Sequence, residues 1–212
     1  MRTNRLRYIF IATLVVLFIG SLVFLNYRLS LREFSVKYQN INKVYVYSTK
    51  SVDSGKNPKP IKTITYSGQS VKIPKGAYTI YYEGKNGYNS LYKYFYLYKN
   101  GQVLWLSPGY SQSKLDSIRD AQLPAIKKSI ADKYPLVSLY EIKPGSLYGN
   151  GEWYGTTLVY KGGDVFNSDT LRIVLHKESG AWVVKTSPPN ISLSKIYNPG
   201  IPEDILNSVN TQ

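Results

Sequence analysis

The chain has 212 residues, a formal net charge of +14, 21 tyrosines and no cysteine. The absence of cysteine excludes a disulfide framework and thiolate metal sites. Tyrosine, valine and isoleucine recur in alternating patterns that favour strands over helices. An all-helical fold is therefore not expected.

The positive charge is concentrated in one part of the chain. Residues 40–108 contain ten lysines and two acidic residues, whereas residues 109–212 contain eleven basic and ten acidic residues. A basic field attracts anionic polymers or lipid headgroups over about one Debye length, ~8 Å at physiological salt. The alternative is that scattered lysines only keep a strand-rich surface soluble and protect its edges.

Residues 8–27 contain no charged side chain. A helix of that length spans about 30 Å, the thickness of the hydrocarbon core of a bilayer. Thr13 and Ser21 can donate hydrogen bonds to carbonyls of their own helix, so neither prevents burial in lipid. We therefore expect a cytoplasmic tail over 1–7 and a transmembrane helix over 8–27, with about 170–180 residues left for one large domain or two small ones.

The first residues, MRTNRLR, are typical of the start of a signal sequence. The apolar run that follows is longer than the core of a cleaved signal, and Asn26-Tyr27-Arg28-Leu29 offers no small-residue cleavage site. We expect an uncleaved signal-anchor. Basic residues flank both ends of the helix, so their number does not decide the orientation. The arginines of the short tail lie within seven residues of the helix, as in a signal sequence, and this favours a cytoplasmic N-terminus and an extracytoplasmic C-terminal region. In the alternative, inverted orientation, the basic residues 40–108 would be cytoplasmic and would bind anionic lipid or nucleic acid. Nucleic acid is the less favoured of these two partners.

The first module is expected to be a small antiparallel β-sandwich over residues 41–108, after a juxtamembrane stalk over 28–40. Glycine, proline and asparagine turns separate short alternating runs, a pattern typical of such sandwiches. Lys99-Asn100-Gly101 predicts a hairpin between the last two strands, and a polar loop is expected over 48–60. The expected strands cover residues 43–47, 61–66, 69–73, 77–83, 91–98 and 102–106.

One stretch of this module resembles the PEGA-type repeat, a small surface-exposed β-sandwich. The likeness lies in residues 70–80, SVKIPKGAYTI, and in the Gly87-Tyr88 pair that follows. That family shows a strand, a Pro-x-Gly turn, a Tyr-x-Ile/Val strand and a Gly-Tyr pair; its Pro-Glu-Gly-Ala signature is absent here. The resemblance covers residues 41–106 and implies an extracellular display or binding module without enzymatic activity.

The second module, residues 109–212, has the pattern of an α+β domain. Ser113 and Asp116 have the spacing of a capping box at a helix start, and Pro124 suits the first turn of a second helix. The helices are expected to pack on one face of an antiparallel sheet, and the order of elements loosely resembles cystatin-like or NTF2-like folds. Strands are expected over 136–142, 152–160, 170–177 and 181–186, with a hairpin across 178–180, an edge segment over 191–197 and a terminal helix starting at 202–204.

The best candidate binding surface is the run of residues 91–98. In a strand, Tyr92, Tyr94, Tyr96 and Tyr98 share one face at a spacing of about 7 Å. Four phenol rings in a row can stack on sugar rings, and Lys93 and Lys99 are the nearest basic residues for acidic substituents. The alternative is that this face is the buried one, since tyrosine is also a favoured strand residue.

Other candidates for chemistry are weaker. His176 is the only histidine; it is expected on a solvated face with Arg172 and suits neither a catalytic triad nor a metal site. The loop residues Asp164, Asn167 and Asp169 are weak calcium candidates. The helix residues Asp116, Asp120 and Asp132 are expected to pair with Arg119 and Lys128.

No phosphate-binding loop, dinucleotide motif or nucleophile elbow occurs, so we expect no enzyme, no cofactor and no metal. The favoured function is a non-enzymatic single-pass bacterial surface protein that binds an anionic wall polymer, a glycan or another envelope protein. The alternative is a scaffold subunit of a secretion or conjugation-type envelope complex, assembled through the NTF2-like half. A glycan hydrolase that uses carboxylates such as Glu83 or Glu152 is the least favoured function.

Overall fold

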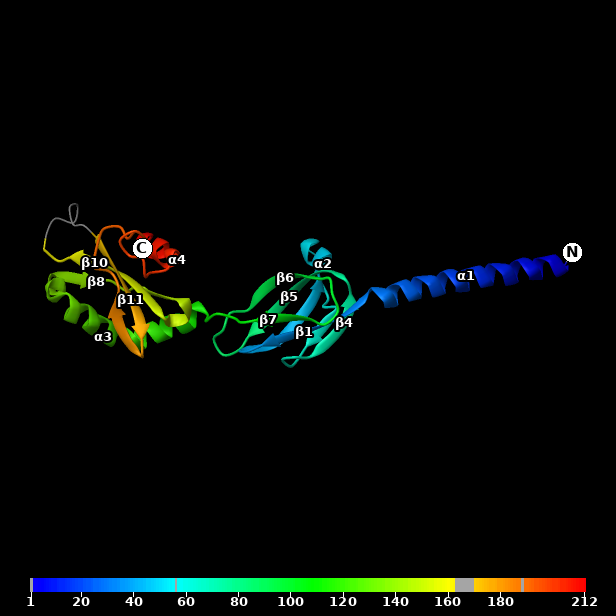
Figure 1. The fold of residues 1–212 in the computed structure, drawn as a ribbon, viewed down its shortest axis with the longest axis horizontal. Coiled ribbons are helices and arrows are strands. Elements are labelled where there is room, and N and C mark those ends of the chain that lie inside the picture. The colour runs from blue at the N-terminus through cyan, green and yellow to red at the C-terminus, as the bar shows by residue number, and fades with distance from the viewer. Residues whose placement is uncertain (1, 56, 163–169, 188) are drawn as a thin grey trace. The chain divides into compact units, whose positions relative to one another are not determined.

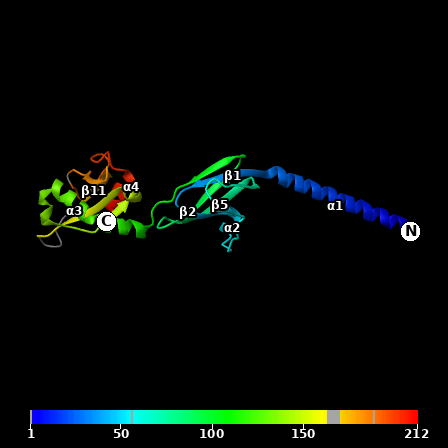
Figure 2. The ribbon, with the colours of Figure 1, turned by 90° about the horizontal axis from the view of Figure 1, so that it is seen from below.

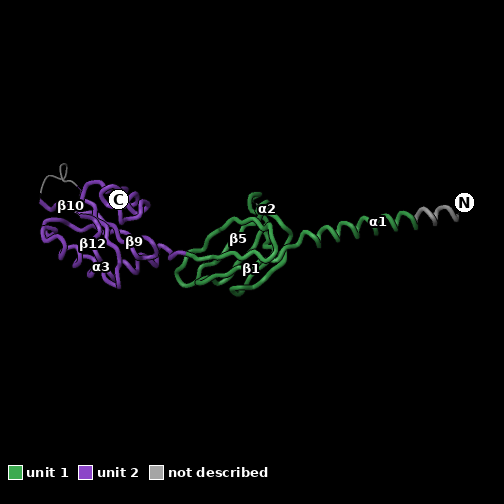
Figure 3. The backbone as a smooth tube through the Cα atoms, in the orientation of Figure 1, with its two compact units in different colours: residues 1–108 green, residues 109–212 purple. Residues whose placement is uncertain are grey.

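The structure is a computed structural model that describes residues 2–55, 57–162, 170–187 and 189–212 (Figure 1). The chain divides into two compact units, Met1–Pro108 and Gly109–Gln212 (Figure 3). The first contains the apolar helix and a β-sandwich, and the second is an α+β domain. The fold class expected from the sequence is confirmed.

The N-terminal helix α1 covers Arg2–Ser30. Its segment Phe10–Ser30 is long and apolar enough to cross a membrane, and none of it is buried in the structure. A core helix of a soluble domain would bury at least one apolar face, so this helix has the exposure that a lipid-embedded segment requires. Length and composition of this kind are shared by membrane anchors and signal sequences.

In the described residues of the first unit, seven strands form two sheets. The sheet orders are β4-β1-β7 and β3-β2-β5-β6. Every pairing is antiparallel except that of β1 with β7, which is parallel. The strands are β1 Leu31–Tyr38, β2 Ile41–Ser48, β3 Lys62–Ile64, β4 Ser70–Pro74, β5 Gly76–Gly84, β6 Leu91–Leu97 and β7 Gln102–Leu106.

The prediction of a juxtamembrane stalk over residues 28–40 is wrong. Most of that segment is β1, the central strand of its sheet, hydrogen-bonded to β4 on one side and to β7 on the other. Phe34 and Val36 are buried in the sandwich core. The short alternation of apolar and polar residues is that of a strand, but nothing local shows that two distant strands will pair with it.

The prediction of a hairpin between β6 and β7 is also wrong. β6 pairs with β5, and β7 pairs with β1 in the other sheet. The turn between them is held by β1, because the Glu33 amide donates to Asn100 Oδ1 and the Gly101 amide donates to the Glu33 carbonyl, both at 2.8 Å. Gly101 has φ +72°, as a tight turn requires. An Asn-Gly turn therefore predicts where the chain reverses but not which strands pair.

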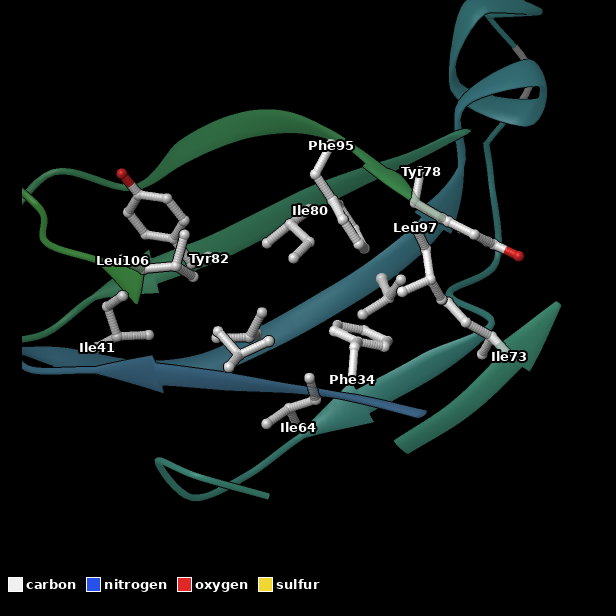
Figure 4. Close-up of a cluster of buried hydrophobic side chains, with 13 residues drawn as sticks. Phe34, Ile41, Ile64, Ile73, Tyr78, Ile80, Tyr82, Phe95, Leu97 and Leu106 are labelled. Atoms are coloured by element: carbon white, nitrogen blue, oxygen red, sulfur yellow. The ribbon is translucent and has the colours of Figure 1, made fainter. Parts of the chain in front are cut away.

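The core of the sandwich lies between the two sheets (Figure 4). Phe34 from β1 meets Phe95 from β6 with ring centroids 5.2 Å apart, and Tyr78 from β5 lies 5.7 Å from Phe95. The contact between Phe34 and Phe95 joins the two sheets, whereas Tyr78 and Phe95 lie on neighbouring strands of one sheet. The expected polar loop over 48–60 contains a short helix, α2 Thr49–Asp53, in which no residue is buried.

The strands described in the second unit form an antiparallel sheet of order β12-β11-β10-β8, in which β9 also pairs with β10. The turn between β11 and β12 contains Ser179 and Gly180 at φ 48° and 87°, so the expected hairpin across 178–180 is confirmed. The elements are α3 Gln112–Lys133, β8 Tyr140–Ile142, β9 Ser146–Tyr148, β10 Trp153–Tyr160, β11 Thr170–Glu178, β12 Ala181–Val184 and α4 Glu203–Asn210, with 3-10 turns at Pro135–Leu139 and Gly149–Gly151.

Three details of this unit correct the sequence-based expectations. A single helix, α3, replaces the two expected helices, with Pro124 inside it, and its N-cap is Ser111 rather than Ser113. The first part of the strand expected over 136–142 is a 3-10 turn. Residues 191–197 do not form a strand; an isolated bridge between Arg172 and Asn190 is the nearest pairing.

The helices cover both faces of the sheet, not one face as expected. On one face, Ile126 and Ile130 of α3 pack in a cluster with Ile173 and Leu175 of β11. On the other face, residues of α4 cluster with Val174, the β11 residue between them in sequence. Because consecutive strand residues point to opposite faces, Ile173-Val174-Leu175 can serve two cores only if both faces are covered.

Candidate functional site

The tyrosines of β6, and Tyr98 directly after it, face solvent. The side chains of Tyr92, Tyr94, Tyr96 and Tyr98 are 65%, 61%, 54% and 61% exposed, whereas Phe95 and Leu97 on the opposite face are buried. The structure therefore excludes the alternative in which these four tyrosines form the sandwich core. Their exposure is the property that a stacking platform needs.

Half-buried tyrosines on two neighbouring strands extend this row. Tyr92 pairs in register with Tyr81 of β5, and Tyr81 with Tyr45 of β2. Their ring centroids are 4.8 Å and 6.1 Å apart. Residues directly opposite on neighbouring strands share a face of the sheet, so the single row expected from the sequence is one edge of a broader surface. We call this surface the tyrosine face: Tyr45, Tyr47, Tyr81, Tyr92, Tyr94, Tyr96 and Tyr98.

Sequence reasoning missed Tyr45, Tyr47 and Tyr81. Each lies in a run of alternating residues, and the alternation shows which residues of one strand share a face. What the sequence does not contain is the register that brings β2 and β5 beside β6. Only strand pairing joins these residues to the β6 row.

The tyrosine face carries few charges. Lys43 and Glu83 are directly opposite each other on β2 and β5, so their charges offset one another. A hydrogen bond from the Tyr45 hydroxyl to the Glu83 carboxylate is the largest cause that raises the pKa of Tyr45. The face is therefore aromatic and close to neutral, with hydroxyl groups as its main polar atoms.

The two lysines expected beside the tyrosines are placed differently. Lys99 Nζ lies 5.7 Å from the ring centre of Tyr98 and belongs to the end of the tyrosine face. Lys93 has the parity of Phe95 and lies on the opposite side of β6, where its Nζ donates to the Trp105 carbonyl at 3.4 Å. Lys93 is therefore removed from the candidate site.

His176 lies on the face of the sheet that α4 covers. Its ring stacks on Trp153 with centroids 4.1 Å apart, and its Nδ1 is 3.3 Å from Glu178 Oε1. Arg172, on the same face, donates from Nε to the Val209 carbonyl at 3.1 Å. The expectation of a solvated face is therefore wrong for Arg172, which the terminal helix contacts, and His176 is half-buried beside Trp153.

The acidic helix residues pair as expected. Arg119 binds Asp116 at 3.1 Å and Asp120 at 2.9 Å, and Lys128 binds Asp132 at 2.5 Å. The calcium candidates Asp164, Asn167 and Asp169 lie outside the described residues. Within the described part of the chain, no three histidine or acidic side chains gather as a metal site would require.

Comparisons with known proteins identify structural similarity but no family. No family model matches the chain, and no curated protein matches it. Among solved structures, a DUF3823 family protein from Parabacteroides merdae is similar over 76% of this chain and 96% of that chain, at 10% identity and a TM-score of 0.26. A TM-score at this level does not establish a shared fold, so the functional argument rests on the tyrosine face.

Proposed function

We propose that the protein is a non-enzymatic, single-pass membrane protein whose tyrosine face binds a glycan of the cell envelope. The observation that carries the proposal is the row of exposed phenol rings at Tyr92, Tyr94, Tyr96 and Tyr98, which half-buried tyrosines of β2 and β5 extend. The four tyrosines of the β6 row are 54–65% exposed, so the fold itself covers less than half of each residue. A partner that covers these rings with apolar surface removes them from water, and this burial contributes favourably to the free energy of binding.

The chemistry of the tyrosine face fits sugar rings. A pyranose ring has one face of C–H groups, which packs on an aromatic ring, and peripheral hydroxyls, which bond to phenol hydroxyls. Successive tyrosines on the exposed face of β6 are about 7 Å apart, so several rings can contact successive sugar units of a polymer. Because Lys43 and Glu83 offset each other, contact area is expected to supply most of the affinity, with Lys99 available to acidic substituents.

The proposal includes the orientation of the chain in the membrane. A helix that fits a bilayer at the start of the chain supports a membrane anchor, with the basic tail cytoplasmic and both folded units extracytoplasmic. The two-sheet architecture of residues 31–106 supports, without identifying, a PEGA-like display module. The hydrogen bond between Tyr45 and Glu83 gives that carboxylate a structural partner, which supports binding without catalysis.

The direct test is retention of the detergent-solubilised full chain on insoluble envelope glycan. We expect retention by the native chain and a loss of about fivefold in affinity for each of Tyr92→Ala and Tyr94→Ala, because a stacked ring contributes about 1 kcal/mol. The matched control is Tyr66→Ala, which removes an exposed tyrosine that lies outside the tyrosine face. Equal retention of all four proteins would reject the tyrosine face as the binding surface.

A second candidate is the scaffold subunit of an envelope complex. The observation that favours it is a pair of apolar side chains in the second unit, Ile196 and Tyr197, which are 85% and 83% exposed. An exposed apolar pair of this kind fits a protein contact. This candidate predicts that other membrane proteins co-purify with the full chain and are lost in Ile196→Ser/Tyr197→Ser, whereas glycan retention is unchanged.

A further inference from the structure

The sandwich is joined to the apolar helix without a linker. Ser30 is the last residue of α1 and Leu31 is the first residue of β1, and the ribbon runs directly from one into the other (Figure 2). The Lys75 amide donates to the Ser30 carbonyl at 2.9 Å, and Leu31 pairs with Pro74. The turn between β4 and β5 is therefore fixed beside the end of the helix.

A second turn is fixed at the same end of the sandwich. Asn100 and Gly101 are hydrogen-bonded to the backbone of Glu33, three residues after Ser30. Pairing of distant strands thus brings basic residues from two parts of the sequence to one place. We call them the basic rim: Arg28, Arg32, Lys72 and Lys75.

A cavity of about 480 Å³ lies within the basic rim, and Arg28, Arg32, Lys72 and Asn100 contribute to its lining. Arg32 is held there by hydrogen bonds from one guanidinium nitrogen, Nη1, to the carbonyls of Leu29 and Leu31 at 2.7 Å and 2.8 Å. The acidic side chain in the lining is Glu33, whose carboxylate lies 3.7 Å from Lys72 Nζ. Three basic side chains against one acidic side chain leave the cavity positive.

We propose that the basic rim binds anionic phospholipid headgroups and that its cavity holds the phosphate of one of them. If α1 spans a bilayer, its end lies where the hydrocarbon gives way to headgroups, so the rim meets the layer of lipid phosphates. Guanidinium groups bind phosphate oxygens through paired N–H donors, and lysines add point charges. Exposed Tyr27, in the last helical turn, has the amphipathic ring typical of that layer.

This inference rests on the membrane anchoring in the proposed function but not on the tyrosine face, and it holds for either orientation. Its consequence is that the lipid positions the sandwich as well as anchoring it. Lys72 of β4 is opposite Glu33 of β1, whereas Arg32 is opposite Ile73 and its guanidinium bends back to the carbonyls of Leu29 and Leu31. Both basic residues line the cavity, so a headgroup there contacts two neighbouring strands of one sheet. The first unit is then seated on the membrane surface by charge in addition to its helix.

The test uses the full chain reconstituted in phosphatidylcholine vesicles with trace spin-labelled lipids. Electron spin resonance gives the association of labelled phosphatidylglycerol relative to labelled phosphatidylcholine at the protein surface. We expect a preference for phosphatidylglycerol that falls by about fivefold or more in Arg32→Gln/Lys72→Gln. The matched control is Lys43→Gln/Lys85→Gln, which removes the same charge at the opposite end of β5 and its turn and should keep the preference.

Three results would overturn the inference. An equal preference in the native chain and the Arg32/Lys72 variant would show that the basic rim does not select lipids. An equal loss in both double variants would show that overall charge, not the rim, is responsible. Displacement of labelled phosphatidylglycerol by soluble glycerol phosphate, but not by chloride at the same ionic strength, would assign the cavity to a free phosphate ester. Because no glycan is present, failure here leaves the retention test of the tyrosine face unaffected.

Discussion

At the scale of single residues, Glu178 has an altered acidity that depends on its neighbours. Hydrogen bonds from Lys185 and then from His176 lower the pKa of this carboxyl below its ordinary value of 4.5. A lowered pKa in the folded state means that the interaction stabilises the fold above about pH 4.5 and is lost as pH falls through the folded-state pKa. This pH window lies on the acidic side of neutrality.

We expect Lys185→Met to raise the pKa of Glu178 toward 4.5, since Lys185 makes the largest contribution. The measurement is an NMR titration of the side-chain carboxyl carbon. Lys128→Met is the control, because Lys128 pairs with Asp132 elsewhere on the domain and should leave Glu178 unchanged. An unchanged pKa in the Lys185 variant would contradict the assigned cause.

A second residue-scale prediction concerns Gly155 in β10. A Cβ at this position would lie 2.2 Å from Val209 Cγ2, so a side chain here forces α4 away from the sheet. We expect Gly155→Ala to lower the free energy of unfolding by about 1–3 kcal/mol, measured by thermal or denaturant unfolding. Adding Val209→Ala should recover part of the loss, and Gly200→Ala, which meets no atom within 4 Å, should be nearly neutral.

At the scale of elements, the role of β1 gives the clearest prediction. Phe34 is 1% exposed in the sandwich core, and truncation of a buried phenylalanine costs about 3–5 kcal/mol. We expect Phe34→Ala to destabilise the first unit by that amount in the detergent-solubilised full chain. Lys37→Ala, an exposed position on the same strand, is the control. Similar unfolding curves for both variants would restore the interpretation of this segment as a stalk.

In helix α3, by contrast, a substitution is expected to stabilise the protein. Pro124 lies inside it, where proline removes one helical hydrogen bond and restricts the preceding turn. The side chain is exposed, so little packing is lost on substitution. We expect Pro124→Ala to raise the free energy of unfolding by about 1–3 kcal/mol. A loss of stability would show that the proline shapes the contact of α3 with the sheet.

At the scale of the whole molecule, β1 determines where the folded part begins. A fragment of residues 31–212 keeps every strand of the sandwich, whereas a fragment of residues 41–212 lacks the strand between β4 and β7. We expect the longer fragment to be soluble and to unfold cooperatively, and the shorter one to aggregate or to lose the first unit's transition in calorimetry. Two similar transitions in both fragments would contradict the central position of β1.

Membrane association is expected to depend on the residues that precede β1. The full chain is expected in the membrane fraction, released by detergent but not by salt, because an apolar helix of 21 residues is stabilised by lipid and not by charge. The fragment of residues 31–212 should remain in solution. Protease added to intact cells should remove the folded units if they are extracytoplasmic and leave them whole if the topology is inverted.

The sequence by itself determined the features that depend on neighbours along the chain. Residues 8–27 mark the apolar helix by composition alone, and six strands of the sandwich follow from alternation and turn residues. The hairpin across 178–180 follows because Gly180 accepts the positive φ angle that its turn requires. These signals extend over a few residues, which is why they are readable without a partner.

Tertiary structure alone decided the features that depend on pairing and burial. Alternation in residues 91–98 defines two faces but does not say which is buried; Phe95 and Leu97 fill the core, so the tyrosines are exposed. The register of β2, β5 and β6 assembles the tyrosine face, and the pairing of β1 with β4 assembles the basic rim. Both surfaces consist of residues far apart in sequence, and only long-range packing brings such residues together.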